Sequence, residues 1–294
     1  LCLSLLGSLR GHLLDARFHH RPRLRVGALR LVDQLPLVDA ARHQAMTSSR
    51  AGSGRQAAAS PGRAQASSFT RRIVEAVAER ARSGDPVRVL GLTGPPGTGK
   101  TTIAAELARA LPEAGIPVAG LAPMDGFHMS NAVLAARGIA DHKGAPDTFD
   151  MGGYVALLGR VRRADGVVLA PDYRRDLHEP VAASLPVEVD GVVITEGNYL
   201  GLELPGWADV RGLIDLLVFI DTPFDELASR LIDRHMSFGR DRADAAHWVR
   251  TVDAANMALV ERTKERADLV LSLSPSPVAV GASCRCRGVL PLAA

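Results

Sequence analysis

Eight consecutive residues of this 294-residue chain combine glycines, a lysine and a threonine at a spacing suited to binding phosphate. They run Gly94-Pro95-Pro96-Gly97-Thr98-Gly99-Lys100-Thr101 and fit the pattern G-x-x-x-x-G-K-[ST]. In such a loop successive backbone N–H groups surround a phosphate, the lysine reaches the β and γ oxygens, and the final hydroxyl ligates Mg²⁺. The loop therefore predicts that the chain binds a nucleoside triphosphate.

The flanking residues supply the strand and the helix that must position this loop. Residues 87–92 are a short run rich in β-branched residues and leucine, and residues 102–111 carry apolar side chains at helical spacing. The start of that helix, with Thr102 in its first turn, adds the positive end of the helix dipole to the anion site. A Gly/Pro surface turn that fits the pattern by accident is the alternative, and it leaves the strand and the helix unexplained.

Asp125 is the candidate catalytic base. It follows a predicted strand at residues 116–122, and ligands of parallel α/β sheets lie beyond the carboxyl ends of the strands. Phosphoryl transfer to a hydroxyl needs a carboxylate that orients the hydroxyl and accepts its proton. The alternative is an Asx turn that stabilises the Asp-Gly step, which is compatible with catalysis.

Glu196 is the candidate acidic group for Mg²⁺. It follows the strand-like residues 192–195, where a carboxylate can support the metal directly or through water, together with Thr101. The alternative is a carboxylate that caps a backbone turn.

Four arginines lie close together between two predicted helices. Such a segment can close over a bound nucleotide and neutralise charge on the transferred phosphoryl group, and Arg234 and Arg240 are the candidates for this role. A solvated helix face paired with nearby acids is the alternative. The four residues are Arg230, Arg234, Arg240 and Arg242.

The elements that must hold these groups alternate between strand and helix. Apolar strands without alternating polarity, separated by helices, favour a parallel sheet covered on both faces. We therefore expect an α/β fold, with the three-layer α/β/α arrangement of P-loop NTPases, a mainly parallel sheet and an Arg-bearing helical lid. The other predicted elements are strands at 167–169, 216–221 and 269–271, and helices at 69–82, 131–137 after Ser130, 151–161 after Asp150, 224–235 after Thr222-Pro223, and 242–266.

The charge of the chain is distributed unevenly. The net charge is +3, yet residues 1–68 contain ten arginines against three aspartates, and residues 276–294 add two arginines without an acid. Residues 69–275 therefore carry a net charge of −6. An acidic core does not favour nucleic-acid binding, which needs a basic face.

The composition divides the chain into three parts. We expect residues 1–68 to be a disordered arm or to lie upstream of the natural start, at Met46 or nearer Phe69, with a transit peptide as the alternative. Residues 69–275 form the predicted kinase-like domain, and 276–294 an unstructured tail. All three cysteines lie outside this core and no apolar run is long enough to span a membrane, so we expect a cytoplasmic protein.

Further segments, taken in order, resemble the P-loop kinase family that contains uridine kinase, phosphoribulokinase and bacterial pantothenate kinase, and most of all its uridine-kinase-like branch. The resemblance covers residues 87–271. The order Asp172-Tyr173-Arg174-Arg175 departs from both the pantothenate kinase and the uridine kinase pattern, which leaves the acceptor open. Besides the loop, the segments are Met124–His128, Lys143–Asp150, Ala170–Arg175, Ile194–Tyr199 and Arg230–His235.

The resemblance implies roles for residues of these segments. Lys143 is expected near the reacting phosphate and the acceptor, with a solvated loop lysine as the alternative, and it joins Lys100, Asp125 and Arg234 as a catalytic candidate. Independently of the resemblance, Trp207 and Trp248 are expected to be packing residues rather than platforms for the adenine base. The candidates for acceptor binding are Phe127, His128, Tyr173, Arg175, Asn198 and Tyr199.

We therefore expect a kinase that uses ATP and Mg²⁺ to phosphorylate the hydroxyl of a small molecule. A nucleoside-like acceptor is favoured, with pantothenate or a sugar as alternatives. A P-loop NTPase that acts as a switch or scaffold is a different class, although the sequence lacks the Asn-Lys-x-Asp segment of GTPases. A binding module without catalysis is disfavoured because the loop, the base and the metal acid are all present. The sequence leaves the oligomeric state open, with a homodimer among the alternatives.

Overall fold

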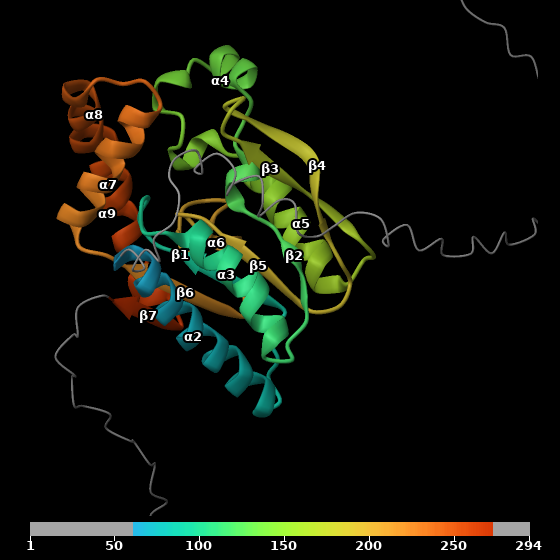
Figure 1. Ribbon diagram of the computed structural model, residues 1–294. Coiled ribbons are helices and arrows are strands. Elements are labelled where there is room, and N and C mark those ends of the chain that lie inside the picture. The colour runs from blue at the N-terminus through green and yellow to red at the C-terminus, as the bar shows by residue number, and fades with distance from the viewer. Residues whose placement is uncertain (1–60, 273–294) are drawn as a thin grey trace, which may run out of the picture. The chain divides into compact units, whose positions relative to one another are not determined.

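Parallel strands form the central sheet of the computed structural model, which describes residues 61–272 (Figure 1). The sheet has five strands in the order β2-β5-β1-β6-β7, and each pair of neighbours is parallel. The mainly parallel sheet predicted from the sequence is confirmed. The strands are β1 (Val89–Thr93), β2 (Val118–Leu121), β5 (Val192–Glu196), β6 (Leu216–Asp221) and β7 (Leu269–Ser272).

Helices cover both faces of this sheet (Figure 1). Short 3₁₀ turns at Met124–Phe127, Ala140–His142, Pro146–Thr148 and Lys264–Arg266 connect some of the elements. The helices are α2 (Pro61–Arg82), α3 (Lys100–Glu113), α4 (Asn131–Arg137), α5 (Met151–Arg163), α6 (Ala208–Arg211), α7 (Phe224–Ser237), α8 (Arg242–Trp248) and α9 (Ala254–Glu261).

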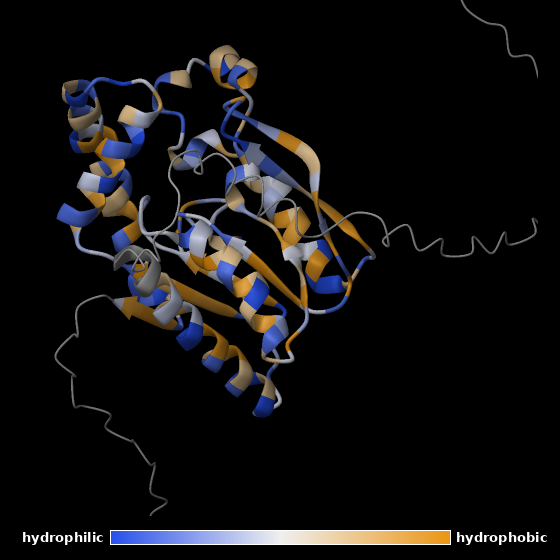
Figure 2. Ribbon diagram, viewed as in Figure 1, coloured by the Kyte–Doolittle hydropathy of each residue, from blue (hydrophilic) through white to orange (hydrophobic). Residues whose placement is uncertain are grey.

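The core lies in two layers because successive residues of a strand point to opposite faces of the sheet. Leu90 of β1 packs in one buried cluster with Ile73 of α2 and Leu107 of α3. Val89 packs in the other cluster with Leu158 of α5. The strands are correspondingly apolar, whereas the helices carry hydrophilic residues on their outer sides (Figure 2). This arrangement confirms the predicted three-layer α/β fold.

One part of the predicted sheet is wrong. Of the predicted strand 167–169, residues 168 and 169 belong to β3 (Val168–Arg174), which pairs antiparallel with β4 (Glu179–Val187) in a separate two-stranded hairpin. The second strand was not predicted, since it contains two prolines and several small residues that are atypical of strands. The paired residues Val168 and Val187 anchor the hairpin in the core, while Leu169, the next residue of β3, is 54% exposed.

Local capping signals were reliable where a side chain could reach the backbone. Ser130 accepts a hydrogen bond from the N–H of Val133 at the start of α4, and Asp150 does so from Gly153 at the start of α5. The predicted cap at Thr222 is wrong, because α7 begins at Phe224 and the buried Thr222 hydroxyl has no partner within the described part of the chain.

Two predicted helix boundaries also differ from the structure. Helix α2 begins at Pro61, inside the segment expected to lack structure, and the buried Ala66 extends its apolar face to Phe69. The predicted helix 242–266 is divided into α8, a π-helical turn at Val249–Asp253 and α9. The expectations for residues 1–60 and 276–294 lie outside the described residues.

Gly126 joins the segment that carries Asp125 to the hairpin. A Cβ atom at Gly126 would lie 2.3 Å from the carbonyl oxygen of Pro171 in β3. Because that contact is with backbone, a side chain could enter only if the hairpin moved. The position therefore requires glycine and fixes the distance between the two segments.

Gly126→Ala is expected to lower the free energy of unfolding by about 1–3 kcal/mol, because the added methyl group overpacks this contact. The measurement is urea denaturation of the full chain. Gly152→Ala in α5 is the matched control, since its Cβ would meet no atom closer than 3.8 Å and alanine is the better helix former. Equal stability of the two variants would contradict the steric role of Gly126.

Candidate active site

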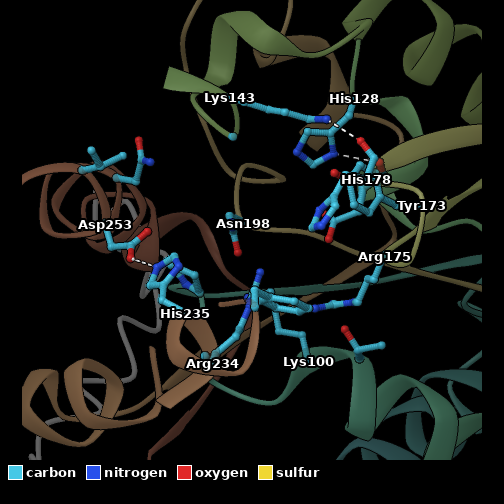
Figure 3. Close-up of a pocket in the computed structure, with 18 of the residues that line it drawn as sticks. Lys100, His128, Lys143, Tyr173, Arg175, His178, Asn198, Arg234, His235 and Asp253 are labelled. Atoms are coloured by element: carbon cyan, nitrogen blue, oxygen red, sulfur yellow. Dashed lines mark hydrogen bonds and ion pairs between the residues drawn. The ribbon is translucent and has the colours of Figure 1, made fainter. Parts of the chain in front are cut away.

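The candidate site is a cavity of about 710 Å³ at the carboxyl ends of the parallel strands. Its walls come from the loop after β1, the segment after β2, the end of β5, the β3–β4 turn and the α7–α9 group. Figure 3 shows side chains from these elements pointing into the same space. Ligands of parallel α/β sheets bind at this edge, as the sequence led us to expect.

The phosphate loop wraps around the side chain of its own lysine. Lys100 is 6% exposed, and its Nζ donates hydrogen bonds to the carbonyl oxygens of Gly94 (2.8 Å) and Pro95 (2.9 Å). Burial lowers the pKa of Lys100 to about 8, although the charges of Glu196 and Asp125 oppose this effect. A buried cation bonded only to neutral oxygens, beside the unbonded N–H groups of a helix start, fits the phosphates of a nucleotide.

The loop is held close to the neighbouring strand. Gly94 has a φ of +144°, and a Cβ there would lie 2.5 Å from the carbonyl oxygen of Ile220 in β6. A residue with a side chain would push the loop away from the sheet. Glycine at this position therefore sets where the phosphate loop begins.

Thr101 and Glu196 form an oxygen pair beside the lysine. The Thr101 hydroxyl donates to Oε1 of Glu196 at 2.9 Å. Burial, followed by the nearby charge of Asp125, raises the pKa of the Glu196 carboxyl well above its usual range. A hydroxyl and a carboxylate that face one cavity match Mg²⁺, which takes oxygen ligands and is held by only one or two protein groups plus substrate phosphates.

Asp125 lies in the 3₁₀ turn after β2 and lines the cavity with the phosphate loop and Glu196. Its carbonyl oxygen accepts a hydrogen bond from Nδ1 of His128 at 2.8 Å, so Nε2 is the acceptor of that ring. His128 packs against Phe149, with ring centroids 4.0 Å apart, and against Tyr173 at 4.8 Å. Burial lowers the pKa of His128, which favours the neutral imidazole.

Lys143 lies on the opposite side of the cavity from the phosphate loop (Figure 3). Its Nζ donates to Oδ1 of Asn131 and to the carbonyl oxygen of His178, both at 2.6 Å, and lies 5.3 Å from the ring centroid of Tyr173. Partial burial lowers its pKa. The lysine expected near the reacting phosphate thus connects α4 to the turn of the hairpin.

The α7–α9 group provides the remaining wall. Arg234 and Arg240 both line the cavity, and the Arg240 guanidinium lies 4.1 Å from the ring centroid of Trp248. Burial and the nearby charge of Arg175 lower the pKa of Arg234. Trp248, expected to be a packing residue, packs against Arg240 and also contributes to this wall.

Arg230 and Arg242 do not line the cavity, unlike Arg234 and Arg240, and Arg230 has a contact of its own. It donates to the carbonyl oxygen of Gly97 at 3.2 Å and forms an ion pair with Glu226. It is absent from the described lining of the cavity. Arg230 therefore supports the phosphate loop through the carbonyl oxygen of Gly97.

A histidine and an aspartate join the end of α7 to the π-helical turn. Nε2 of His235 lies 2.8 Å from Oδ2 of Asp253, and the two side chains are 18% and 13% exposed. Both line the cavity with Asn256. Sequence reasoning missed all three, although Asp253 and Asn256 stand three residues apart, a spacing that places polar side chains on one helix face.

Most of the predicted site residues meet in this cavity. Phe127 and Tyr199 do not: Phe127 is 8% exposed in the core, and the fully buried Tyr199 donates its hydroxyl to the carbonyl oxygen of Gly144 at 2.7 Å. Gly94, Pro95 and Thr98 belong to the loop but not to the lining. The predicted residues that line the cavity are Pro96, Gly97, Gly99, Lys100, Thr101, Thr102, Asp125, His128, Lys143, Tyr173, Arg175, Glu196, Asn198, Arg234 and Arg240.

Removal of the His235–Asp253 contact is expected to destabilise the α7–α9 group, because the contact is largely shielded from water. A double-mutant cycle of His235→Ala and Asp253→Ala should give a coupling energy of about 1 kcal/mol in urea unfolding. The control is the exposed pair Arg174–Asp176, for which we expect a smaller coupling. Equal coupling in the two cycles would contradict a structural role for His235.

Comparison with known proteins identifies the family. The model of the phosphoribulokinase / uridine kinase family matches residues 89–278. An uncharacterized protein of Escherichia coli K12, YggC, is 35% identical over 189 residues, which cover 63% of this chain and 78% of that protein. A uridine kinase of Borrelia turicatae is 29% identical over 187 residues, which cover 63% of this chain and 86% of that protein.

A solved structure agrees with this assignment. It is described as a "putative fructose transport system kinase" from Silicibacter sp. TM1040 and has 33% sequence identity with this chain. The matched region covers 69% of this chain and 98% of the chain in that structure, with a TM-score of 0.64. The chain belongs to the phosphoribulokinase / uridine kinase family and has a P-loop kinase fold.

Proposed function

We propose that this chain is an ATP-dependent kinase that transfers the γ-phosphoryl group to a hydroxyl of a small molecule. The observation that carries the proposal is the presence of Asp125 in the same cavity as the phosphate loop and the Thr101–Glu196 pair. A switch or scaffold needs a nucleotide site, but it needs no carboxylate poised as a base toward a second substrate.

Each side chain has a distinct part in the proposed reaction. Lys100 and the loop N–H groups hold the phosphates of ATP, while Asp125 orients the acceptor hydroxyl. The hydroxyl oxygen bonds to the γ-phosphorus as the bond from that phosphorus to the β–γ bridging oxygen breaks, ADP leaves with the bridging oxygen, and the hydroxyl proton passes to Asp125. Arg234 and Arg240 neutralise the charge on the transferred group. Thr101 and Glu196 would hold Mg²⁺, which supplies charge neutralisation at the phosphates.

The acceptor is the less defined substrate. The family's members include proteins named uridine kinase and pantothenate kinase, which implies a small molecule with a hydroxyl group. A nucleoside, pantothenate and a sugar each present such a group. The side chains between Asp125 and the hairpin turn would distinguish among them.

The cellular location and the oligomeric state stay predictions. Among residues 61–272, no helix combines the length and the apolar composition that crossing a membrane requires. The relatives' kinase names support a small-molecule substrate, and cytoplasmic ATP would be available to such an enzyme.

Asp125→Asn is expected to lower acceptor-dependent release of ADP by about 10²- to 10⁴-fold, because the amide cannot accept the proton. The measurement supplies ATP, Mg²⁺ and a pool of small hydroxyl compounds, and follows ADP. Asp176→Asn, which alters an exposed carboxylate outside the cavity, is the control. ATP hydrolysis that needs no acceptor and is unchanged in Asp125→Asn would contradict the kinase proposal and favour a P-loop NTPase that acts as a switch.

Glu196→Gln is expected to raise the Mg²⁺ concentration needed for half-maximal ADP release by about tenfold or more, because the variant keeps the size of the side chain but loses its charge. The measurement is a Mg²⁺ titration at fixed ATP. Glu106→Gln is the matched control, since Glu106 accepts a hydrogen bond from Thr70 outside the cavity. An unchanged Mg²⁺ requirement in Glu196→Gln would exclude the proposed metal role.

A further inference from the structure

Two adjacent arginines at the end of β3 have opposite surroundings. Arg174 donates from Nε and Nη2 to the two carboxylate oxygens of Asp176, at 2.9 and 2.7 Å, and lies outside the cavity lining. Arg175 lines the cavity, and within residues 61–272 it forms no hydrogen bond or ion pair. Successive residues at a strand end point to opposite sides, so one arginine is neutralised outside and the other brings its charge inside.

Arg175 reaches the centre of the cavity. Figure 3 shows Arg175 and Arg234 extending toward one another from the hairpin and from α7. The charge of Arg175 also contributes to lowering the pKa of Arg234 and of His128, which lie on different elements. Arg175 thus adds a second cation beside Arg234, where acids also act: the charge of Asp125 raises the pKa of Arg234, and the charge of Arg175 lowers that of Glu196. The guanidinium of Arg175 favours the binding of an anion at this point.

The carboxylates that line the cavity are already engaged. Glu196 accepts from Thr101, Asp253 contacts His235, and Asp125 is the proposed base. None of these three carboxylates forms an ion pair with Arg175 in the described part of the chain. The guanidinium of Arg175 thus forms no direct ion pair within residues 61–272, although its charge acts on Glu196 and Asp172, and it can bind a substrate anion.

Lys143 adds a second positive charge on the same side of the cavity. Its hydrogen-bond partners are the neutral oxygens of Asn131 and His178, and the charge of Glu179 acts on it without a direct ion pair among the described residues. Lys100, Arg234 and Arg240 are assigned to the phosphates of ATP. The acceptor side comprises Asp125, His128, Lys143, Tyr173, Arg175 and His178. It thus has two cations and one carboxylate, which is the proposed base.

This charge distribution fits an anionic acceptor better than a nucleoside. A nucleoside is neutral, and the two adjacent hydroxyls of its ribose are donors for which a carboxylate is the natural partner. Of the aromatic candidates for acceptor binding, Phe127 and Tyr199 are buried in the core, and the ring of Tyr173 packs against His128 and Lys143. An acid with a hydroxyl group would instead place its anion against an arginine, which donates in a fork.

We propose that the acceptor is a small hydroxyl compound bearing a carboxylate or a phosphate, and that Arg175 is the residue that binds this anion. The inference rests on the proposed kinase function. It replaces the nucleoside-like acceptor favoured by the sequence with an anionic one. Transfer proceeds as described above, with the anion held at Arg175 and the hydroxyl at Asp125.

The test compares acceptors in pairs that differ only in the anion: glycerate with glycerol, pantothenate with pantothenol, and fructose 6-phosphate with fructose, together with uridine. ADP release is followed at saturating ATP. We expect the anionic member of a productive pair to be used with a kcat/KM about 10- to 100-fold above that of its neutral partner. The first two pairs report a carboxylate and the third a phosphate ester.

Arg175→Ala should raise the KM for the anionic acceptor about 10- to 100-fold, leave the KM for ATP unchanged, and remove the preference over the neutral partner. Arg175→Lys should raise the KM for the anionic acceptor by a smaller factor, because lysine keeps the positive charge but lacks the paired N–H donors of the guanidinium. Arg174→Ala is the matched control and should resemble the unmodified protein, since Arg174 is neutralised by Asp176 outside the cavity.

The outcomes separate the two proposals. Turnover that prefers uridine or the neutral members would overturn the anionic acceptor and leave the kinase function intact. An Arg175→Ala variant with a raised KM for ATP and an unchanged KM for the acceptor would assign the arginine to the nucleotide and also overturn the inference. If no member supports ADP release above the rate without acceptor, the kinase function fails and the inference fails with it.

Discussion

The burial of Lys100 is the constraint on which the rest of the site depends. An ammonium group removed from water is costly unless polar partners surround it, and here the partners are the carbonyl oxygens of Gly94 and Pro95. The loop must therefore curl around the lysine, which in turn places the first turn of α3 against the cavity. Because the partners are neutral, the charge of Lys100 is still available to a phosphate. The lowered pKa of Lys100 reflects the loss of solvation of its charged form on burial.

Close backbone contacts transmit this arrangement to the rest of the cavity. Gly94 brings the loop against Ile220 of β6, and Gly126 brings the Asp125 segment against Pro171 of β3. In both places backbone meets backbone, so the separation between elements is set without flexible side chains. A catalytic group needs such rigid support, since small displacements are costly in phosphoryl transfer. The hairpin, although outside the main sheet, is thereby part of the same framework.

The wall formed by α7–α9 depends on an irregularity in the helix. The π-helical turn Val249–Asp253 changes the direction in which the following residues project, and it brings Asp253 to the same cavity as Trp248. Asp253 then contacts His235 at the end of α7. A continuous helix, as the sequence suggested for residues 242–266, would present a different set of side chains. The wall is therefore a product of how three short helical segments pack, and not of any one of them.

The sequence by itself determined the features whose causes are local. The glycine-rich loop, the apolar strands β1, β5 and β6, and the caps Ser130 and Asp150 depend on neighbouring residues, so their patterns could be read directly. Asp125 and Glu196 could be placed because parallel strands end at one edge of a sheet.

Only the tertiary structure decided which neighbours of those residues face the cavity. Phe127 and Tyr199 stand beside functional candidates in the chain but fill the core, because their large apolar rings gain most from burial. Arg174 and Arg175 are identical and adjacent, yet an acid at Asp176 neutralises one while the other enters the site. Such choices depend on contacts between distant segments, and no local pattern contains them.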